Sequence, residues 1–390
     1  MCLEVLAPAG NLEKLKIAQA YGADAVYLAG QRFGLRSAAD NFTLGELSQA
    51  RDLTQAAGIK MYLAINAHLL DWELEQLPEY LQELKKFAPD AVIVSDLGVA
   101  KLVEKHLGVP LHVSTQASVL NSEHARIWQE AGAKRIVAGR ELSIEEASKI
   151  KAQTGLEMEL FIQGALCMSY SGHCVISNYL AARDSNRGGC IQSCRYKYSI
   201  TDSKGNQQDA FFMNSKDLRG LELLPAFLEA GIDSVKIEGR MKSNLYLATT
   251  LRAYRGALRD LKAGQTDRLA IWEKELEKIP NRDYTTGNLA EVAGFDSVHH
   301  TAGEAISHYS LAGTVLYIEN QMAWFQARNS LGCEDQIEFL SPQGEVVLRG
   351  LKGMKNAMGE ELERLQPGQL AQLPAQGLQA YMVGRKQTLT

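Results

Sequence analysis

The sequence predicts an α/β protein built on a closed (β/α)8 barrel of the TIM type. Eight short runs of apolar and β-branched residues occur in the first 240 residues, and amphipathic stretches with helical periodicity separate them. No glycine-rich dinucleotide fingerprint follows the first run, which disfavours the open doubly wound sheet that the same alternation also allows. The interval between the seventh and eighth runs is far longer than the others, as expected for an insertion at a barrel mouth.

The eight runs are the expected barrel strands. They span residues 4–6, 25–28, 60–65, 91–95, 111–114, 135–137, 157–162 and 234–237. Two intervening helices begin with capping boxes, Thr43 with Glu46 and Ser143 with Glu146. Within the long interval, residues 196–200 and 210–213 are expected to pair as a hairpin around a turn at Gly205.

The end of the chain has a different periodicity. Residues 244–262 predict a long helix and residues 268–278 a charged one, but after Ala312 the apolar period becomes two. Strands are expected at 314–318, 322–327, 336–340 and 345–348, as in a small antiparallel β domain. The expected division is a barrel over 1–265 with a cysteine-rich insertion at 163–215, a helical linker over 266–310, and a small β-barrel-like domain over 311–390.

Composition is that of a globular protein, with 46% hydrophobic and 22% charged residues. The formal net charge of −5 means that any contact with nucleic acid must come from a local basic patch. The start of the sequence lacks the features of a secretory signal, and no apolar run approaches the roughly 18 residues that span a bilayer. We therefore expect a soluble, cytoplasmic protein without a membrane segment.

Four cysteines lie close together in the sequence, within the long interval. Cys167, Cys174, Cys190 and Cys194 are separated by six, fifteen and three residues. In a reducing compartment, clustered thiols are more often metal ligands than disulfides. Structural zinc sites favour hooks with two to four intervening residues, and only the last pair has that spacing. An iron-sulfur cluster is therefore favoured over zinc, while the remaining cysteine pair, Cys2 and Cys333, has no expected metal role.

Polar side chains near the ends of the predicted strands are candidates for a site at the barrel mouth. Period two along a strand places Ser114 and Gln116 on the same face at the end of the run 111–114. In the same way it places Lys236 and Glu238 on the same face at the end of the run 234–237. These four are the candidate catalytic residues. The candidate substrate-binding residues, whose arginines suit a small carboxylate, are Arg36, Asn66, Arg140 and Arg240. The alternative is that each arginine pairs with a neighbouring acid, such as Arg140 with Glu141.

Basic and aromatic residues alternate around the cysteines, a composition that suits unpaired RNA bases and their phosphates. The candidate RNA-binding residues are Arg183, Arg187, Arg195, Lys197 and Tyr170. The alternative is that the tyrosines cover the apolar side of a metal cluster while the basic groups face water.

These residues carry a resemblance to a known family. Residues 159–177, which include Cys167 and Cys174, resemble the signature of the collagenase-like peptidases of unassigned catalytic type, peptidase family U32. Shorter matches occur at residues 6–10, 22–27, 114–116, 214–218, 236–242 and 284–287. The resemblance covers about the first 290 residues, and the remaining part resembles the small β domain often attached to this family.

The resemblance implies RNA modification rather than proteolysis. Within the family, the chain is most similar to the branch that takes part in tRNA hydroxylation, forming 5-hydroxyuridine at the wobble position. Membership of that branch implies a [4Fe-4S] cluster on the four cysteines, prephenate instead of molecular oxygen as the hydroxyl source, and tRNA as partner. A homologous protein is a further candidate partner. Two alternatives remain open: a peptidase, and a non-catalytic RNA-binding module with a structural metal such as zinc. No Gly-x-Ser-x-Gly or His-Glu-x-x-His motif supports the peptidase.

Overall fold

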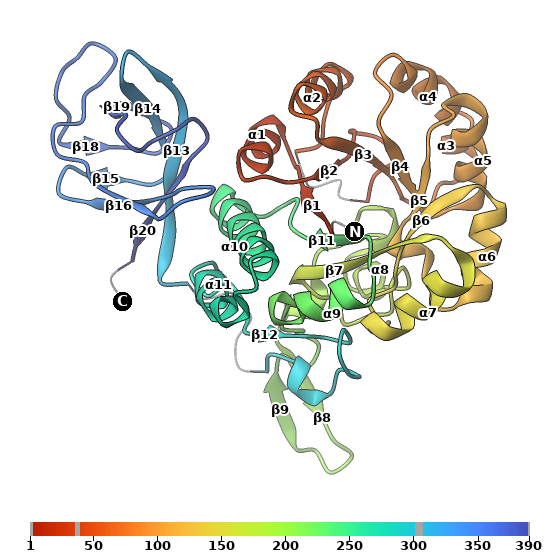
Figure 1. Ribbon diagram of the computed structural model, residues 1–390. Coiled ribbons are helices and arrows are strands. Elements are labelled where there is room, and N and C mark those ends of the chain that lie inside the picture. Colours follow the sequence, from red (N-terminus) through yellow and green to blue (C-terminus); the bar gives the residue numbers. More distant parts are fainter. Residues whose placement is uncertain (1–2, 36–39, 301–306, 389–390) are drawn as a thin grey trace. The chain divides into compact units, whose positions relative to one another are not determined.

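The protein is described here from a computed structural model, which covers residues 3–35, 40–300 and 307–388. Eight parallel strands form a closed barrel, as the sequence predicts (Figure 1). They are β1 (Glu4–Pro8), β2 (Ala25–Leu28), β3 (Lys60–Ile65), β4 (Ala91–Val94), β5 (Leu111–Val113), β6 (Ala133–Val137), β7 (Glu157–Ala165) and β11 (Ser234–Ile237). The barrel closes because β11 pairs with both β1 and β7, placing Ser234 beside Glu4 on one side and Glu159 on the other.

Helices separate the strands. They are α2 (Leu44–Ala57), α3 (Asp71–Leu74), α4 (Leu77–Lys85), α5 (Leu97–His106), α6 (Ser122–Glu130), α7 (Ile144–Thr154) and α9 (Leu224–Glu229). Both predicted capping boxes are present: the side chains of Thr43 and Ser143 accept from the backbone of Glu46 and Glu146, whose carboxylates accept in return. Each box satisfies two amide donors that the first helical turn would leave unpaired.

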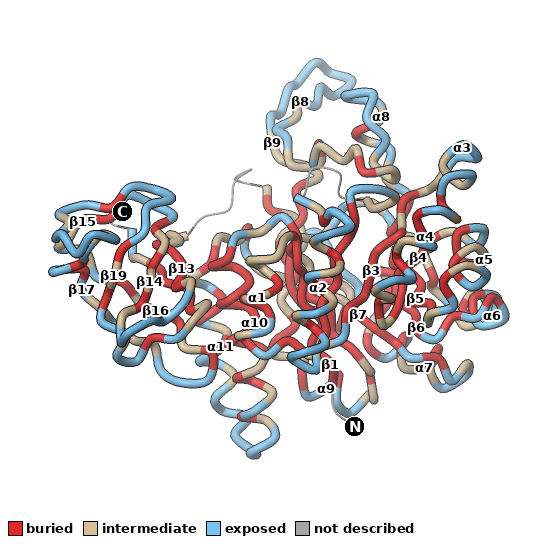
Figure 2. Tube along the Cα trace, turned by 90° about the horizontal axis from the view of Figure 1, so that it is seen from above, coloured by how far each residue is buried: buried red, intermediate tan, exposed pale blue. Residues whose placement is uncertain are grey.

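The cysteine insertion (residues 163–215) contains little regular structure. It includes the short helix α8 (Ile176–Ala181), two 3-10 turns, η2 (Ser185–Arg187) and η3 (Ser193–Arg195), and a hairpin of β8 (Tyr198–Thr201) and β9 (Gln207–Ala210). In Figure 2 the insertion projects from one end of the barrel, and α8, β8 and β9 are largely exposed while the barrel strands are buried.

The return arm of the hairpin differs from the expected one. It spans residues 207–210 and not 210–213, with Thr201 opposite Gln207. The Asp202 carboxylate accepts from the amides of Lys204 and Asn206 at 2.8 and 2.9 Å, which closes the turn early. The new strand therefore begins directly after Asn206.

Two short strands extend the sheet beyond the barrel. β10 (Asp217–Arg219) runs antiparallel to the end of β7, and β12 (Tyr284–Thr285) runs parallel to β10. Neither was expected, because two or three residues carry no readable periodicity.

A second compact unit comprises residues 13–23, 241–281 and 306–390. It contains most of α1 (Leu12–Ala20), then α10 (Asn244–Lys262), α11 (Leu269–Leu276) and a six-stranded antiparallel sheet. That sheet has the order β17 (Val347–Gly350), β16 (Gln336–Leu340), β20 (Val383–Gln387), β13 (Tyr309–Glu319), β14 (Met322–Ala327) and β19 (Leu370–Pro374); β15 (Leu331–Gly332) pairs with β18 (Arg364–Leu365). The predicted helix over 244–262 and the antiparallel domain are confirmed. The boundaries at residues 265 and 310 stay a prediction.

Buried contacts explain why the helices of this unit belong with the sheet. The fully buried guanidinium of Arg385 on β20 pairs with Glu275 on α11 at 2.8 Å, and Arg252 on α10 contacts the same carboxylate at 3.0 Å. The Tyr21 hydroxyl bonds the carbonyl of Leu340, and burial raises the pKa of Tyr21. Each of these buried polar groups has a hydrogen-bond or ion-pair partner, which offsets the free-energy cost of removing the group from water.

Candidate active site at the barrel mouth

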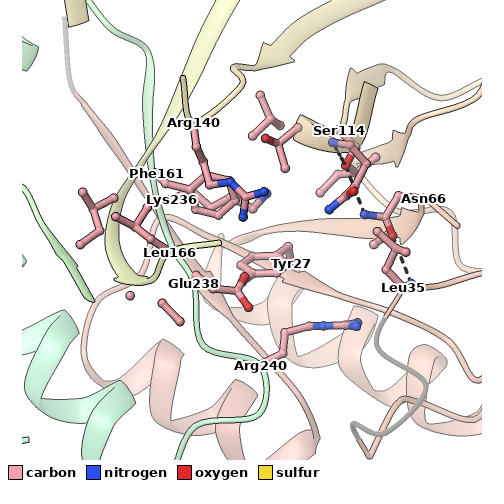
Figure 3. A pocket seen from close by; sticks show the side chains of 18 of the residues that line it. Tyr27, Leu35, Asn66, Ser114, Arg140, Phe161, Leu166, Lys236, Glu238 and Arg240 are labelled. Carbon is pink, nitrogen blue, oxygen red and sulfur yellow. Dashed lines mark hydrogen bonds between the residues drawn. The ribbon is translucent and has the colours of Figure 1, made fainter. Parts of the chain in front are cut away.

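A pocket of about 900 Å³, including space open to solvent, lies over the strand ends of the barrel. Its lining comes from β2, β3, β4, β6, β7, β10 and β11, from the residues that follow the barrel strands, including those after β5, and from Ser185 of the insertion. Loops at the carboxyl ends of barrel strands are where this architecture carries its chemistry. Figure 3 shows ten of the lining residues by name.

Among the described residues, three basic side chains line this pocket. Arg140 comes from the loop after β6, Lys236 from β11, and Arg240 from the segment just after β11. In Figure 3, Arg140 and Arg240 lie on opposite sides of Tyr27 and Glu238. The Lys236 ammonium lies 4.3 Å from the centre of the Tyr27 ring, which places a cation–π contact in the pocket wall.

Amides and a hydroxyl form the opposite wall. The Asn66 side-chain amide donates to the Ser114 hydroxyl at 3.2 Å, and the backbone amide of Gln116 donates to the same hydroxyl at 3.3 Å (Figure 3). Asn66 in turn accepts from the backbone of Leu35 at 3.4 Å. This chain of hydrogen bonds orients Ser114 and leaves it no neighbouring general base among these partners.

Glu238 is the one carboxylate among the described lining residues. The Tyr27 hydroxyl donates to it at 3.1 Å and to the carbonyl of Ile237 at 3.0 Å. A carboxylate beside a phenol inside a cationic pocket can accept or deliver a proton, so Glu238 is placed for acid–base work.

A buried ion network lies beneath the pocket. It consists of Glu4, Arg135, Glu159 and Lys236, which come from four different strands. Lys236 lies 2.8 Å from Glu159, and Arg135 lies 3.1 Å from the other oxygen of that carboxylate. Burial alone would raise the pKa of Glu159, but Lys236 and Arg135 lower it below its usual value. The network therefore holds the Glu159 carboxylate ionised, and its two carboxylates balance the charges of Arg135 and Lys236.

His112 is a buried, uncharged side chain close to this ion network. Its ring meets the Tyr62 ring edge-on at 4.6 Å, and Nδ1 has no hydrogen-bond partner in the described chain. Burial, and then the positive charge of Arg135, lower the pKa of His112 well below its usual value. His112 is thus uncharged at neutral pH.

The cysteine loop (residues 167–174) is seated against the pocket rim. Ser171, which is fully buried, accepts hydrogen bonds at its hydroxyl from the Arg140 backbone at 3.2 Å and from Arg140 Nε at 3.3 Å. Its carbonyl accepts from the Ser118 hydroxyl at 2.6 Å, and its amide donates to Glu141 at 2.8 Å. The Glu141 carboxylate therefore accepts from the loop backbone. The Arg140 side chain bonds Ser171 and does not form the alternative pair with Glu141.

Gly172 explains why the loop approaches so closely. Its φ is +77°, and a Cβ atom there would lie 2.0 Å from the Gln116 carbonyl oxygen. Only glycine combines that conformation with that contact.

The four clustered cysteines are thiols and not disulfides; Cys167 is exposed and the other three are partly buried. Burial raises the pKa of Cys194, Arg195 opposes the rise, and the thiols of Cys167, Cys190 and Cys174 add to it. The other three thiols of the insertion are therefore within electrostatic reach of Cys194. Within residues 3–35, 40–300 and 307–388, no group of three or more His, Cys, Asp or Glu side chains is arranged to hold a single metal ion.

The candidate RNA-binding residues divide into two sets. Arg187 pairs with Glu73 at 2.7 Å and so ties the insertion to the barrel, whereas Arg195 donates to Asn214 at 2.8 Å and to the carbonyl of Ser215 at 2.6 Å and so holds two parts of the insertion together. The exposed set is Arg183, Lys197 and Tyr170.

The tertiary structure gathers most candidate site residues in one pocket. They are Asn66, Ser114, Gln116, Arg140, Lys236, Glu238 and Arg240. Arg36 lies outside the described residues. Sequence reasoning missed Tyr27, Phe161 and Gln163, which also line the pocket. Period two from Glu159 would have placed Phe161 and Gln163 on the inner face of β7, but the same pattern fits any core strand.

Among the helices of the described residues, none combines the length and the apolarity needed to cross a bilayer.

Comparison with known proteins agrees with this architecture. The sequence pattern of peptidase family U32 matches residues 10–298, and that of the family's C-terminal domain matches residues 307–385. A Bacillus subtilis relative named tRNA hydroxylation protein P1 is 39% identical over 374 residues, covering 92% of this chain and 88% of the relative. Tyr27, Ser114, Lys236 and the four clustered cysteines all lie within the family match.

Two further relatives carry different names. The Escherichia coli tRNA hydroxylation protein P is 31% identical over 416 residues, covering 92% of this chain and 90% of the relative. A Porphyromonas gingivalis protein named collagenase is 27% identical over 392 residues, covering 95% of this chain and 94% of the relative. On the two pattern matches and these near full-length similarities, the chain belongs to peptidase family U32.

Proposed function

We propose that this protein hydroxylates tRNA, forming 5-hydroxyuridine at the wobble position with an iron-sulfur cluster bound by Cys167, Cys174, Cys190 and Cys194. Relatives that match nearly the whole chain carry the name tRNA hydroxylation protein. The observation that carries the proposal is that the cationic pocket and the four-thiol insertion meet at one end of the barrel, joined through Ser171.

The pocket suits a small carboxylate that donates the hydroxyl group. Replacing the C5 hydrogen of uridine by hydroxyl removes two electrons from the base, so the donor that loses its hydroxyl group accepts those electrons together with the hydrogen. Prephenate, a dicarboxylate, is the proposed donor, and molecular oxygen is not consumed. Arg140, Arg240 and Lys236 offer charge-assisted hydrogen bonds to two carboxylates, and Asn66 and Ser114 can bond a hydroxyl or carbonyl group.

The donor set fits a cluster better than it fits zinc. Four sulfurs around one zinc ion, each about 2.3 Å from it, would lie about 3.8 Å apart, and the described residues hold no such group. A [4Fe-4S] cluster binds each thiolate on a different iron, so its four ligand sulfurs need not converge on one ion, and the other three cysteines are near enough to Cys194 to raise its pKa. When bound, the cluster would supply electron transfer beside the pocket.

The exposed face of the insertion supports an RNA substrate. Tyr170 is 64% exposed and Tyr179 is 87% exposed, and Arg183 and Lys197 lie on the same segment. Exposed aromatic rings stack on unpaired bases, and basic groups pair with phosphates. An anticodon loop offers both.

The proposal is tested with tRNA that lacks 5-hydroxyuridine, taken from a strain without this gene. The protein, reconstituted with iron and sulfide without oxygen, is incubated with that tRNA and prephenate, and the nucleosides are analysed by mass spectrometry. We expect 5-hydroxyuridine only when protein, cluster and prephenate are all present. Absence of the product in the complete mixture would contradict the proposal, as would full hydroxylation in a deletion strain with no second pathway.

A peptidase is the second candidate, because one relative is named collagenase. Among the described residues, the Ser114 hydroxyl accepts from two amides and bonds no basic side chain, so Ser114 forms no nucleophile–base pair in this structure. Cleavage of a collagen-like peptide by the cluster-free protein would favour this candidate. Zinc in place of iron, with tRNA binding but no modification, would favour a structural RNA-binding module.

A further inference from the structure

Ser171 belongs to the cysteine loop but contacts the pocket. Ser171 lies between Cys167 and Cys174 and is 0% exposed. Its hydroxyl oxygen accepts hydrogen bonds from the backbone amide and from Nε of Arg140. Thr115, another lining residue, donates to the same hydroxyl at 3.3 Å. A single side chain therefore connects the segment that carries two thiols with two residues of the pocket.

The seat under Ser171 is built from several independent contacts. The Ser118 hydroxyl, the Glu141 carboxylate and the close approach of Gly172 to Gln116 hold the backbone on both sides of the serine. Such a packed arrangement moves as a unit instead of deforming gradually. If the loop leaves its seat, Arg140 Nε loses its partner.

The orientation of Arg140 depends on this contact. Nε is the donor nearest the backbone, and the remaining guanidinium donors extend from it into the pocket in Figure 3. The Arg140 carbonyl is also fixed, because the Asn288 side chain donates to it at 2.9 Å. The backbone and Nε are therefore both held, and the outer nitrogens remain for a ligand.

We propose that Ser171 is a positioning residue that couples the cysteine loop to Arg140, so that a cluster on the loop and a carboxylate in the pocket strengthen each other's binding. The cluster ties Cys167 and Cys174, the two ends of the loop, and so favours the seated conformation in which Arg140 is oriented. Because coupling between two binding sites is reciprocal, the carboxylate favours retention of the cluster by the same factor. This inference rests on the proposed function.

The test measures prephenate affinity by anaerobic calorimetry on the cluster-free and the reconstituted full chain. In the unmodified protein, we expect reconstitution to tighten binding by roughly 5- to 150-fold, the usual range for coupled sites. In Ser171→Ala the ratio should fall to about one, with iron and sulfide content retained, because the serine hydroxyl is the link and not a ligand.

Ser177→Ala is the matched control. Ser177 is 1% exposed and lies in the same insertion, and among the described residues its hydroxyl bonds Ser193 at 3.1 Å and the amide of Ile191 at 3.2 Å, neither of which lines the pocket. Its affinity ratio should equal that of the unmodified protein. A ratio in Ser171→Ala equal to the control would overturn the inference.

A reciprocal measurement decides the matter if Ser171→Ala does not fold. The chelator concentration that removes half of the iron from the unmodified protein should rise when prephenate is saturating, and no rise would overturn the inference. If the unmodified protein binds neither prephenate nor iron, the proposed function fails as well. If it binds both, each with an affinity independent of the other, only the coupling fails.

Discussion

The Lys236 ammonium lies 2.8 Å from a carboxylate oxygen of Glu159, and the Glu159 side chain is completely buried. Arg135 contacts the other oxygen at 3.1 Å. One buried carboxylate thus faces two cations, and one of these cations also lines the pocket. The same contacts that stabilise the barrel interior therefore set the charge beneath the site.

Removal of that carboxylate should destabilise the protein strongly. Glu159→Gln keeps the shape but leaves two buried cations with less negative charge, and breaking a buried pair typically costs about 3–5 kcal/mol. Glu157→Gln is the control: Glu157 also pairs with Arg135, but its side chain is 51% exposed, and the expected loss is about 0–1 kcal/mol. Urea denaturation of both variants measures the difference, and equal losses would show that the network contributes little.

His112 should make stability depend on pH in the mildly acidic range. Its pKa in the folded protein lies well below the usual 6.5, so below pH 6.5 the unfolded chain binds a proton that the folded chain does not. Stability therefore falls as pH decreases through this range, by up to about 1.4 kcal/mol per pH unit for one such group.

His112→Gln should remove that part of the slope, measured as the free energy of unfolding between pH 7 and pH 5.5. An identical slope in His112→Gln would mean that other groups cause the dependence.

Arg140 should be needed for carboxylate affinity. Arg140→Ala removes a charged donor from the pocket, and a hydrogen bond to a charged group is worth about 1.5–3 kcal/mol, which corresponds to a roughly 10- to 150-fold weaker Kd for prephenate. Arg126→Ala removes an exposed arginine of α6 and should leave the Kd unchanged. Calorimetry on the reconstituted proteins measures both values.

The insertion cysteines should bind iron, and Cys333 should not. Cys190→Ala removes one of the four proposed ligands, and we expect its iron and sulfide content after anaerobic reconstitution to fall to a small fraction of the unmodified value. Cys333→Ala, in the C-terminal domain, should retain full content. Full iron content in Cys190→Ala would remove Cys190 from the ligand set.

Gly172 should tolerate no side chain. Gly172→Ala places a Cβ against the Gln116 carbonyl at 2.0 Å, so the cysteine loop must leave its seat. Gly58→Ala is a control with a similar φ, +66°, but with open space around the position. We expect both variants to lose about 1 kcal/mol from backbone strain, but only Gly172→Ala to lose prephenate binding as well.

Local signals predicted most of the fold. Each barrel strand is a short apolar run whose burial demands a sheet covered on both faces, and α10 was predicted to its end residues, Asn244 and Lys262. The capping boxes at Thr43 and Ser143 were readable because donor and acceptor lie three residues apart. The hairpin was readable too, but its return arm was misplaced because side-chain bonds from Asp202 tightened the turn.

The composition of the ion network could not be predicted in the same way. The period-two pattern indicates which side chains point into the barrel. The stagger between neighbouring strands determines which of them lie at the same level along the barrel axis. One example is the register shift between β5 and β6, after which Arg135 lies opposite His112. Nothing in the local sequence around either residue encodes that shift.

By itself, the sequence determined the barrel, the antiparallel C-terminal domain and the thiol-rich insertion, because each depends on periodicity or on residues close together in the chain. Only the tertiary structure decided that Ser171 bonds Arg140, that Arg187 and Arg195 hold the insertion, and that Tyr27 shares a pocket with Lys236. These contacts join residues tens to hundreds of positions apart, and barrel closure brings such residues together without leaving a pattern in the local sequence.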